Sequence, residues 1–267
     1  FAALAFCQDG DEILHANHGF EMYSIVSKVV GAVPKKIKED VNFNLNIENL
    51  IDQTNDATKV IYIASPNNPT GTYLSRDQLV KLMNSISKNI IVVIDGAYVE
   101  YVQKDDYDKG FSLTDEYENI ILTRTFSKTY GLAALRVGWC YTSQKIADII
   151  NKIKPPFNTT TISQSLAIKA LEDKEHIENS VKLNSEIKDW FEKELKLLNI
   201  KTRQTEGNFT LIETSEEEAE KISNHLMNDG IIIRRLNSYN LPNFLRISIG
   251  TKEEMNLTVE SLKKFNV

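Results

Sequence analysis

The sequence has few cysteines, no membrane-length apolar run and no excess of positive charge, and each of these absences excludes a class of protein. Its two cysteines, Cys7 and Cys140, provide no disulfide framework of the kind that small secreted domains use. The longest apolar runs, such as residues 90–94, have the length of a strand and not of a membrane span. The formal net charge of −6 disfavours nucleic acid as the main partner, because phosphate backbones bind basic surfaces.

Signals for secretion, metal binding and repetition are missing as well. No secretory signal is recognisable, so we expect a protein of the reducing cytoplasm. His15 and His18 lie three residues apart, but no Cys, Asp or Glu completes a metal-binding set in this pattern. No internal repeat or low-complexity segment occurs. The chain begins at Phe1, without Met, in a segment typical of a helix end, and we therefore expect an N-terminal portion to precede it.

Three mainly apolar runs indicate strands that are buried on both faces of a parallel sheet. They occupy residues 60–64, 90–94 and 119–123, and a helix begins between the first two at Ser75, where Gln78 completes a capping box. Strands and helices that alternate in this way are typical of right-handed α/β connections. The sequence therefore predicts an α/β fold with a large, mostly parallel sheet flanked by helices.

A Pro155–Pro156 pair breaks the chain after a predicted helix and indicates a domain boundary. We predict a large domain over residues 1–156 and a smaller α+β domain over residues 157–267. The smaller domain is expected to contain a helical region over 162–198 that breaks near Asp173, strands over 210–213, 231–234 and 244–249, and helices over 216–228 and 252–265.

Polar side chains follow the three predicted parallel strands at the points where the strands end. Asn68 follows the first strand, Asp95 the second and Lys128 the third. Ligands of α/β sheets bind beyond the carboxyl ends of the strands, which lie along one edge of the sheet. The sequence therefore predicts one site that contains all three side chains.

Lys128 lies in a hydroxyl-rich turn within the stretch LTRTFSKTYGLAALRVG. A lysine in a constrained site can form an imine with an aldehyde, and pyridoxal phosphate (PLP) is held in enzymes through such a bond. Thr125, Ser127 and Arg136 are the hydroxyls and the planar cation that the phosphate of this cofactor would need. This stretch predicts a PLP site.

Asp95 and the residues around it fit the opposite end of the same cofactor. A carboxylate beside the pyridine nitrogen keeps that nitrogen protonated, and the ring then accepts electrons from the substrate's α-carbon. Tyr98, three residues after Asp95, and Asn68, in the turn PNNPTG, could both form hydrogen bonds with the phenolic oxygen of the ring. The two ends of the cofactor are thus accounted for by different strand ends.

The motifs PNNPTG, D-x-x-Y and TFSK-x7-R, in this order, resemble those of the fold-type I PLP-dependent aminotransferases over essentially the whole chain. The resemblance implies that Lys128 is the catalytic lysine, that Phe20 stacks on the cofactor ring, and that Tyr23 lies close to Asp95 on the substrate side. It also implies homodimers, with phosphate-binding amides and a tyrosine that reaches the partner's site in a preceding N-terminal part. The implied cofactor-binding set is Asn68, Asp95, Tyr98, Thr125, Ser127, Arg136 and Phe20.

The C-terminal stretch GIIIRRLNSYNLPNFLRISIGT resembles the histidinol-phosphate aminotransferase branch of this family. Strand pleating places Arg246 on the side opposite to Leu245 and Ile247, where it could clamp an anion through its guanidinium group. Arg234 matches a second family arginine near the substrate phosphate, and Arg235 has no assigned role.

The implied reaction converts histidinol phosphate and 2-oxoglutarate into imidazole acetol phosphate and glutamate, in histidine biosynthesis. Two other functions stay open at this stage. A related aminotransferase or decarboxylase that acts on an aromatic or phosphorylated amino compound would keep the same cofactor residues. A ligand-sensing module of a transcription regulator could use the same fold, although the acidic charge of the chain disfavours it.

Overall fold

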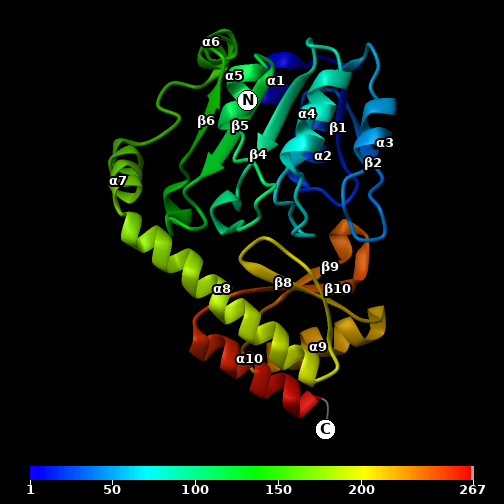
Figure 1. The fold of residues 1–267 in the computed structure, drawn as a ribbon, viewed down its shortest axis with the longest axis vertical. Helices are drawn as coiled ribbons and strands as arrows, with labels where there is room; N and C mark the ends of the chain where they lie inside the picture. The colour runs from blue at the N-terminus through cyan, green and yellow to red at the C-terminus, as the bar shows by residue number, and fades with distance from the viewer. Residues whose placement is uncertain (266–267) are drawn as a thin grey trace.

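The computed structural model describes residues 1–265, which form two sheets, one above the other in Figure 1. The larger sheet has six strands in the order β2-β1-β3-β4-β5-β6, and all neighbours are parallel except β5 and β6. Its strands are β1 (Glu12–Ala16), β2 (Val33–Ile37), β3 (Thr58–Ala64), β4 (Ile91–Asp95), β5 (Ile120–Thr125) and β6 (Gly138–Thr142). The predicted α/β fold with a mostly parallel sheet is confirmed.

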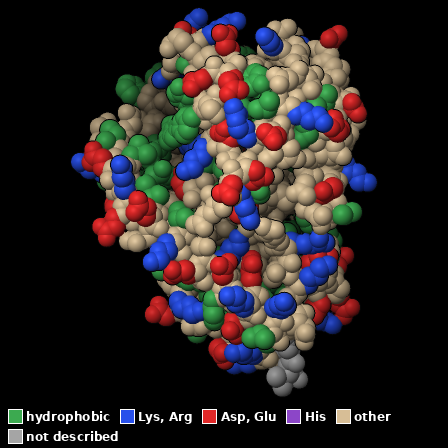
Figure 2. Space-filling view, viewed as in Figure 1, with side chains coloured by type: hydrophobic (Ala, Val, Ile, Leu, Met, Phe, Trp, Pro, Cys, Tyr) green, Lys and Arg blue, Asp and Glu red, His purple; other side chains and the backbone are tan. Residues whose placement is uncertain are grey.

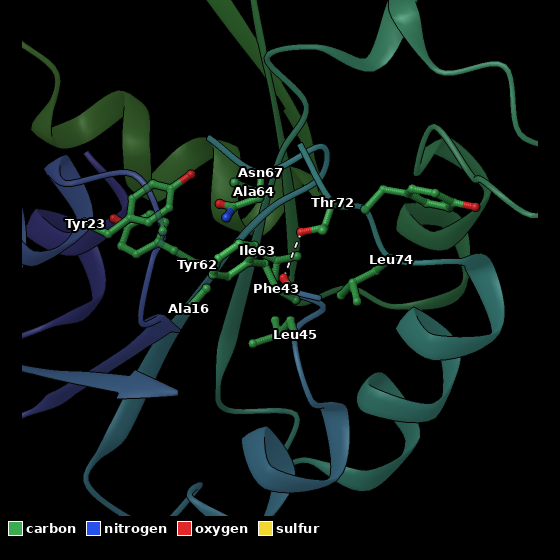
Figure 3. A pocket seen from close by; sticks show the side chains of 12 residues that line it. Ala16, Tyr23, Phe43, Leu45, Tyr62, Ile63, Ala64, Asn67, Thr72 and Leu74 are labelled. Atoms are coloured by element: carbon green, nitrogen blue, oxygen red, sulfur yellow. Dashed lines mark hydrogen bonds between the residues drawn. The ribbon is translucent and has the colours of Figure 1, made fainter. Parts of the chain in front are cut away.

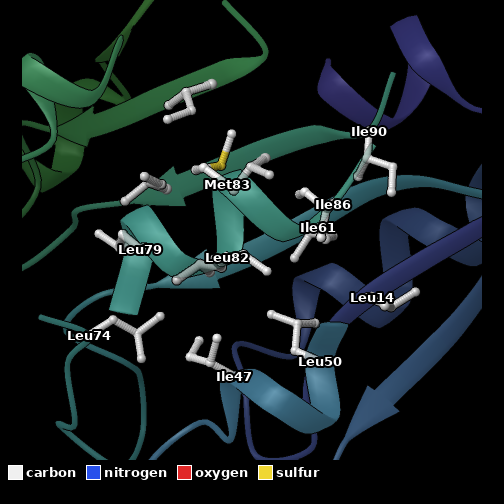
Figure 4. Close-up of a cluster of buried hydrophobic side chains, with 14 of the residues drawn as sticks. Leu14, Ile47, Leu50, Ile61, Leu74, Leu79, Leu82, Met83, Ile86 and Ile90 are labelled. Atoms are coloured by element: carbon white, nitrogen blue, oxygen red, sulfur yellow. The ribbon is translucent and has the colours of Figure 1, made fainter. Parts of the chain in front are cut away.

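Helices cover both faces of the larger sheet because its central strands are apolar on both sides. Ile61 and Ile63 of β3 pack into one core, which Figure 4 shows, and Val60 and Tyr62 pack into another on the opposite face. The first core is closed by α3 (Ile47–Asp52), α4 (Arg76–Ser85) and α5 (Phe111–Glu116), and the second by α1 (Ala2–Phe6), α2 (Met22–Val29) and α6 (Gln144–Ile153).

The smaller sheet is antiparallel, with the order β7-β8-β10-β9. Its strands are β7 (Lys201–Arg203), β8 (Phe209–Glu213), β9 (Arg234–Leu236) and β10 (Leu241–Ser248). Three helices, α8 (Lys174–Leu197), α9 (Glu216–Asn228) and α10 (Lys252–Phe265), cover its outer face, and α7 (Thr161–Glu172) joins the two layers. Short 3-10 turns complete the fold: η1 (Val99–Tyr101), η2 (Ala133–Leu135) and η3 (Asn237–Tyr239).

Local signals in the sequence account for several element ends. Ser75 and Gln78 form the expected capping box at the start of α4. Asp173 ends α7 and caps α8 by accepting a hydrogen bond from the amide of His176, which confirms the break predicted there. The domain boundary at residue 156 stays a prediction.

The strand expected over residues 231–234 is wrong, because β9 begins only at Arg234. Gly230 ends α9 with a φ of 80°, and the amide of Ile231 donates to the carbonyl of Leu226, so this segment still caps the helix. Five further elements, β2, α3, α5, β6 and β7, are not predicted from the sequence. No helix among residues 1–265 is long and apolar enough to cross a membrane.

Candidate active site

The turn after β3 carries Asn68 and is held by residues of the smaller sheet. The Oδ1 atom of Asn68 accepts a hydrogen bond from Nη1 of Arg246, although the two residues are 178 positions apart. The carbonyl of Gly71, in the same turn, accepts a hydrogen bond from the amide of Glu206 at 2.8 Å. Gly71 has a φ of 75° and faces Thr205 so closely that a Cβ atom would clash. The turn is therefore fixed between the two sheets.

Asp95 ends β4 and is held by donors on both of its oxygens. The Tyr23 hydroxyl donates to Oδ2 at 2.8 Å, and the Thr123 hydroxyl donates to Oδ1 at 3.2 Å. Thr123 lies directly beside Asp95 in the parallel register of β4 and β5. Burial raises the pKa of Asp95, although these donors act in the opposite direction.

Tyr23 is a support for Asp95 and has little access to solvent. Only 6% of its surface is exposed, and its ring stacks on Tyr62 with 4.6 Å between centroids (Figure 3). Its proximity to Asp95 is as the family resemblance implies, whereas its expected contact with substrate stays a prediction. Phe20, with 37% exposure, meets the Tyr23 ring edge-on at 5.7 Å.

The turn after β5 carries Lys128 together with the predicted phosphate-binding residues. The Thr125 hydroxyl accepts a hydrogen bond from the amide of Ser127 at 3.0 Å, and this bond shapes the turn. Partial burial, Arg246 and Arg136 all lower the pKa of Lys128, so its amine is neutral at lower pH than an ordinary lysine. The exposed Arg136 has a φ of 49° and donates from Nη1 to the carbonyl of Ala133 at 2.8 Å.

Aromatic rings join the two sheets next to Lys128. Its Nζ lies 5.4 Å from the centre of the Tyr98 ring, and that ring meets the edge of Phe209 at 5.4 Å. The Arg246 guanidinium lies 5.1 Å from the centre of the Phe209 ring on the smaller sheet. Its Nε atom is buried and has no hydrogen-bond partner among the described residues, which leaves a donor for a ligand.

Two arginines of the smaller sheet face this junction side by side. Arg234 of β9 is the direct register partner of Arg246 in β10, so both side chains leave the same face of the sheet. The Nη2 atom of Arg234 lies 3.8 Å from the Oε2 atom of Glu21. Arg235 leaves the other face and pairs there with Glu220 at 3.7 Å. Leu245 and Ile247 pack into the outer core, which confirms the predicted sidedness of Arg246.

The assembled groups match the chemistry of PLP. A largely buried carboxyl group lies at one strand end, hydroxyls and an arginine follow another, and the same turn carries a lysine whose pKa is lowered by partial burial and by two arginines. The Arg246 Nε atom that lacks a partner fits an anionic ligand at the same place. Residues 1–265 contain no cluster of three or more metal-ligating side chains, and the His18 ring pairs with Glu39 at 3.1 Å.

Three residues of this site, Thr123, Phe209 and Glu21, are not predicted from the sequence. Thr123 lies two positions before Thr125, so the period of a strand would have placed both on one face. Phe209 and Glu21 carried no usable signal, because each reaches the site only through contacts with distant segments.

Comparison with known protein families places these residues in a wider context. Residues 1–262 match the family model described as aminotransferase class I and II. A histidinol-phosphate aminotransferase of Pelagibacter ubique is 40% identical over 265 residues, which cover 98% of this chain and 73% of the relative. One from Roseobacter denitrificans is 36% identical over 264 residues, with 98% and 73% covered.

Solved structures share the fold at lower sequence identity. The histidinol-phosphate aminotransferase of Sinorhizobium meliloti, solved in complex with pyridoxal-5'-phosphate, superposes with a TM-score of 0.90 at 23% identity and covers 98% of this chain and 73% of that one. The aspartate aminotransferase of Thermotoga maritima superposes with a TM-score of 0.88 at 23% identity, with 99% and 72% covered. At this identity the likeness concerns the fold alone.

Proposed function

This chain belongs to the class I and II aminotransferases and, within them, to the histidinol-phosphate aminotransferase family, and on that premise we propose its reaction and the residues that perform it. It is a PLP-dependent transaminase. We propose that it converts histidinol phosphate and 2-oxoglutarate into imidazole acetol phosphate and glutamate, and the reverse. The observation that carries this proposal is the meeting of Lys128, Asn68 and the Arg234–Arg246 pair at one junction.

Bound PLP supplies an aldehyde that takes up the amino group and a ring that delocalises the electrons left on the substrate's α-carbon. Lys128 is the residue that we assign to the covalent link with that aldehyde. Its lowered pKa leaves more of the amine neutral, which an attacking nucleophile and a proton acceptor both require. With substrate bound, the Lys128 amine would be the group that accepts the proton from the α-carbon.

Asp95 is assigned to the proton on the pyridine nitrogen of the cofactor. A cationic ring nitrogen beside the carboxylate would offset the burial that raises the pKa of Asp95. The hydroxyls of Tyr23 and Thr123 favour the ionised form of the carboxyl group, because both donate to its oxygens.

Asn68 and Tyr98 are assigned to the phenolic oxygen of the ring. Arg246 occupies the Oδ1 atom of Asn68, so the Nδ2 group is the part of the amide that remains to donate. At the other end of the cofactor, the Thr125 and Ser127 hydroxyls and the Arg136 guanidinium are assigned to its phosphate, and Phe20 to the face of the ring.

Arg246 and Arg234 are assigned to the anionic groups of the two substrates. Like charges directly opposite each other on a sheet destabilise it, and a bound anion removes this cost. A guanidinium can bind a carboxylate or a phosphate through two parallel hydrogen bonds, so one site can serve the phosphate monoester and the dicarboxylate in turn. The buried Nε atom of Arg246 without a partner supports this assignment.

The experiment that tests the reaction is an absorbance titration of the PLP-loaded protein. We expect histidinol phosphate, but not phenylalanine, to convert the bound cofactor to its aminated form at low concentration, and 2-oxoglutarate to reverse the change. A response to phenylalanine alone would support the transaminase chemistry but contradict the assignment of histidinol phosphate as the substrate. A spectrum that responds to no amino compound would overturn the reaction itself.

We also propose that the protein is a cytoplasmic homodimer. On α7, Ser163 and Ala167 are buried, whereas Ile162, Leu166 and Leu171 lie between 43% and 68% exposed. Figure 2 shows hydrophobic side chains gathered on the flank where α7 lies in Figure 1. Exposed apolar patches of this kind mark protein interfaces. Sedimentation equilibrium tests the proposal, and Leu166→Glu should shift the protein towards monomer.

A further inference from the structure

We propose that Glu21 is a specificity-determining residue, which offsets the electrostatic advantage of the phosphate-bearing substrate over the dicarboxylate at their shared arginine site. The inference rests on the proposed function, in which Arg234 and Arg246 bind the anionic groups of both substrates in turn. Glu21 acts as an internal negative charge beside Arg234, and its effect grows with the charge of the bound group.

Glu21 and Arg234 meet across the junction of the two sheets. Glu21 is the N-cap residue of α2, next to Phe20, and Arg234 is the first residue of β9. Their charged atoms lie 3.8 Å apart, which is longer than a hydrogen bond, and the side chains are 35% and 53% exposed. An ion pair of this kind is weak and open to water, so an arriving anion can replace the carboxylate at Arg234.

The pKa of Tyr239 agrees with a place for Glu21 beside the arginine pair. Tyr239 is 7% exposed and lies in η3, the turn between β9 and β10. Arg246 and Arg234 both favour the ionised form of this phenol, whereas Glu21 opposes it. These directions agree with the geometry, in which Glu21 lies 3.8 Å from Arg234 and Arg234 is the register partner of Arg246.

The consequence follows from the charges of the two substrates. A phosphate monoester carries a charge of about −1.5 to −2 at neutral pH, by analogy with phosphorylated side chains, whereas each carboxylate of the dicarboxylate carries −1. At Arg234, next to Glu21, a phosphate would therefore be favoured over a single carboxylate if Glu21 were absent. Because repulsion from Glu21 scales with the same charge, it weakens phosphate binding more than carboxylate binding. Glu21 thus makes the affinities for the phosphate-bearing substrate and for the dicarboxylate more similar. Neither substrate then outcompetes the other for the site that they occupy in turn.

The test compares Glu21→Gln with Glu220→Gln in the PLP-loaded protein. Glutamine keeps the size of the Glu21 side chain and removes its charge. Glu220 forms an ion pair with Arg235. Arg235 directly follows Arg234 in the chain, but its side chain lies on the outer face of the sheet. The two variants therefore remove the same charge from opposite faces.

We expect Glu21→Gln to lower the KM for histidinol phosphate about 2- to 5-fold and that for glutamate by a smaller factor. Calorimetry with inorganic phosphate should show tighter binding by a similar factor. Both effects should shrink at high salt, which screens charges but leaves packing unchanged. Glu220→Gln should leave all three values within about 1.5-fold of the parent, as expected for a surface pair distant from the site.

Two outcomes separate this inference from the proposed function. If Arg234→Gln weakens phosphate binding but Glu21→Gln and Glu220→Gln behave alike, Glu21 has no such role and the arginine site stands. If Arg234→Gln and Arg246→Gln both leave the two KM values unchanged, the arginine site itself is wrong and the inference fails with it. Equal strengthening of phosphate and glutamate binding by Glu21→Gln would also overturn the inference.

Discussion

Arg246 donates a hydrogen bond to the amide oxygen of Asn68, and this bond links the smaller sheet to the turn after β3. Arg246 also lowers the pKa of Lys128 and lies against the ring of Phe209. One guanidinium group therefore contacts a residue that we assign to the cofactor, tunes the residue that we assign to catalysis, and offers its Nε atom to a ligand. A substitution of Arg246 should therefore affect Asn68, the pKa of Lys128 and the binding of an anionic ligand together.

Replacing Arg246 by lysine should test this linkage. Lysine keeps the charge but lacks the planar fork, so it cannot hold Asn68 and a substrate anion at once. We expect the KM values for both substrates to rise by at least about 10-fold, as for loss of a charged hydrogen bond, and the absorbance of the bound cofactor to shift as Asn68 loses its partner. Arg235→Lys, on the other face, is the matched control. Unchanged KM values and an unchanged spectrum in Arg246→Lys would contradict the linkage.

Lys128→Ala should abolish turnover while the fold persists. The variant loses both the covalent link to the cofactor and the amine that moves the α-proton, and the second role alone is worth about 10²–10⁴-fold. We expect kcat to fall by at least that factor in steady-state assays, with an unchanged melting temperature of the apoprotein. Lys145→Ala, an exposed lysine of α6, controls for the loss of a surface charge. Turnover of Lys128→Ala near that of the parent would refute the assignment.

The lowered pKa of Lys128 gives a separate prediction in the apoprotein. Arg246 is one of the groups that lower it, so removing this charge with Arg246→Gln should raise the pKa of Lys128. Acylation of the Lys128 amine, followed by mass spectrometry, should therefore begin at higher pH in Arg246→Gln than in the parent. The pH dependence for an exposed lysine such as Lys182 should be the same in both proteins. A shift to lower pH in the variant would have the wrong sign.

Asp95 should reduce the stability of the apoprotein as the pH rises. Burial raises its pKa above the ordinary value of 3.8, so the native carboxyl group retains a proton that the unfolded chain has already lost. Stability from this group is therefore complete below 3.8 and is lost as the pH rises through the raised pKa. We expect apo Asp95→Asn to melt at a higher temperature than the parent at pH 7, with a smaller difference at pH 4, and to lose activity with PLP. A larger advantage at pH 4 than at pH 7 would argue against this account.

Thr123 should act on the cofactor through Asp95. Thr123→Val keeps the shape of the side chain but removes the donor to Oδ1, and a hydrogen bond to a charged group contributes about 1.5–3 kcal/mol. We expect PLP to bind roughly 10-fold more weakly, by fluorescence titration of the apoprotein. Thr123→Ser keeps the hydroxyl and should restore most of the affinity. Equal affinities for the valine and serine variants would show that the hydroxyl has no role.

Local physical signals in the sequence determined the elements and the chemistry that follows them. Apolar runs form the buried parts of β3, β4 and β5, and the polar residues Asn68 and Lys128 follow two of them because a buried strand must end where polar groups begin. The capping residues Ser75 and Asp173 lie at helix starts, and the side chain of each accepts a hydrogen bond from an amide only three residues ahead. Such patterns act over a few residues and can be read without the fold.

Only the tertiary structure decided which distant groups meet. The bond between Asn68 and Arg246, the contact of Thr123 with Asp95 and the Glu21–Arg234 pair each depend on the register of strands or the placement of one sheet against the other. A strand's pattern states which side chains share a face, but it does not state which segment lies opposite that face. β9 likewise begins only at Arg234, because the amide of Ile231 caps α9 and does not pair with a strand. The apolar run that precedes Arg234 does not distinguish these two roles.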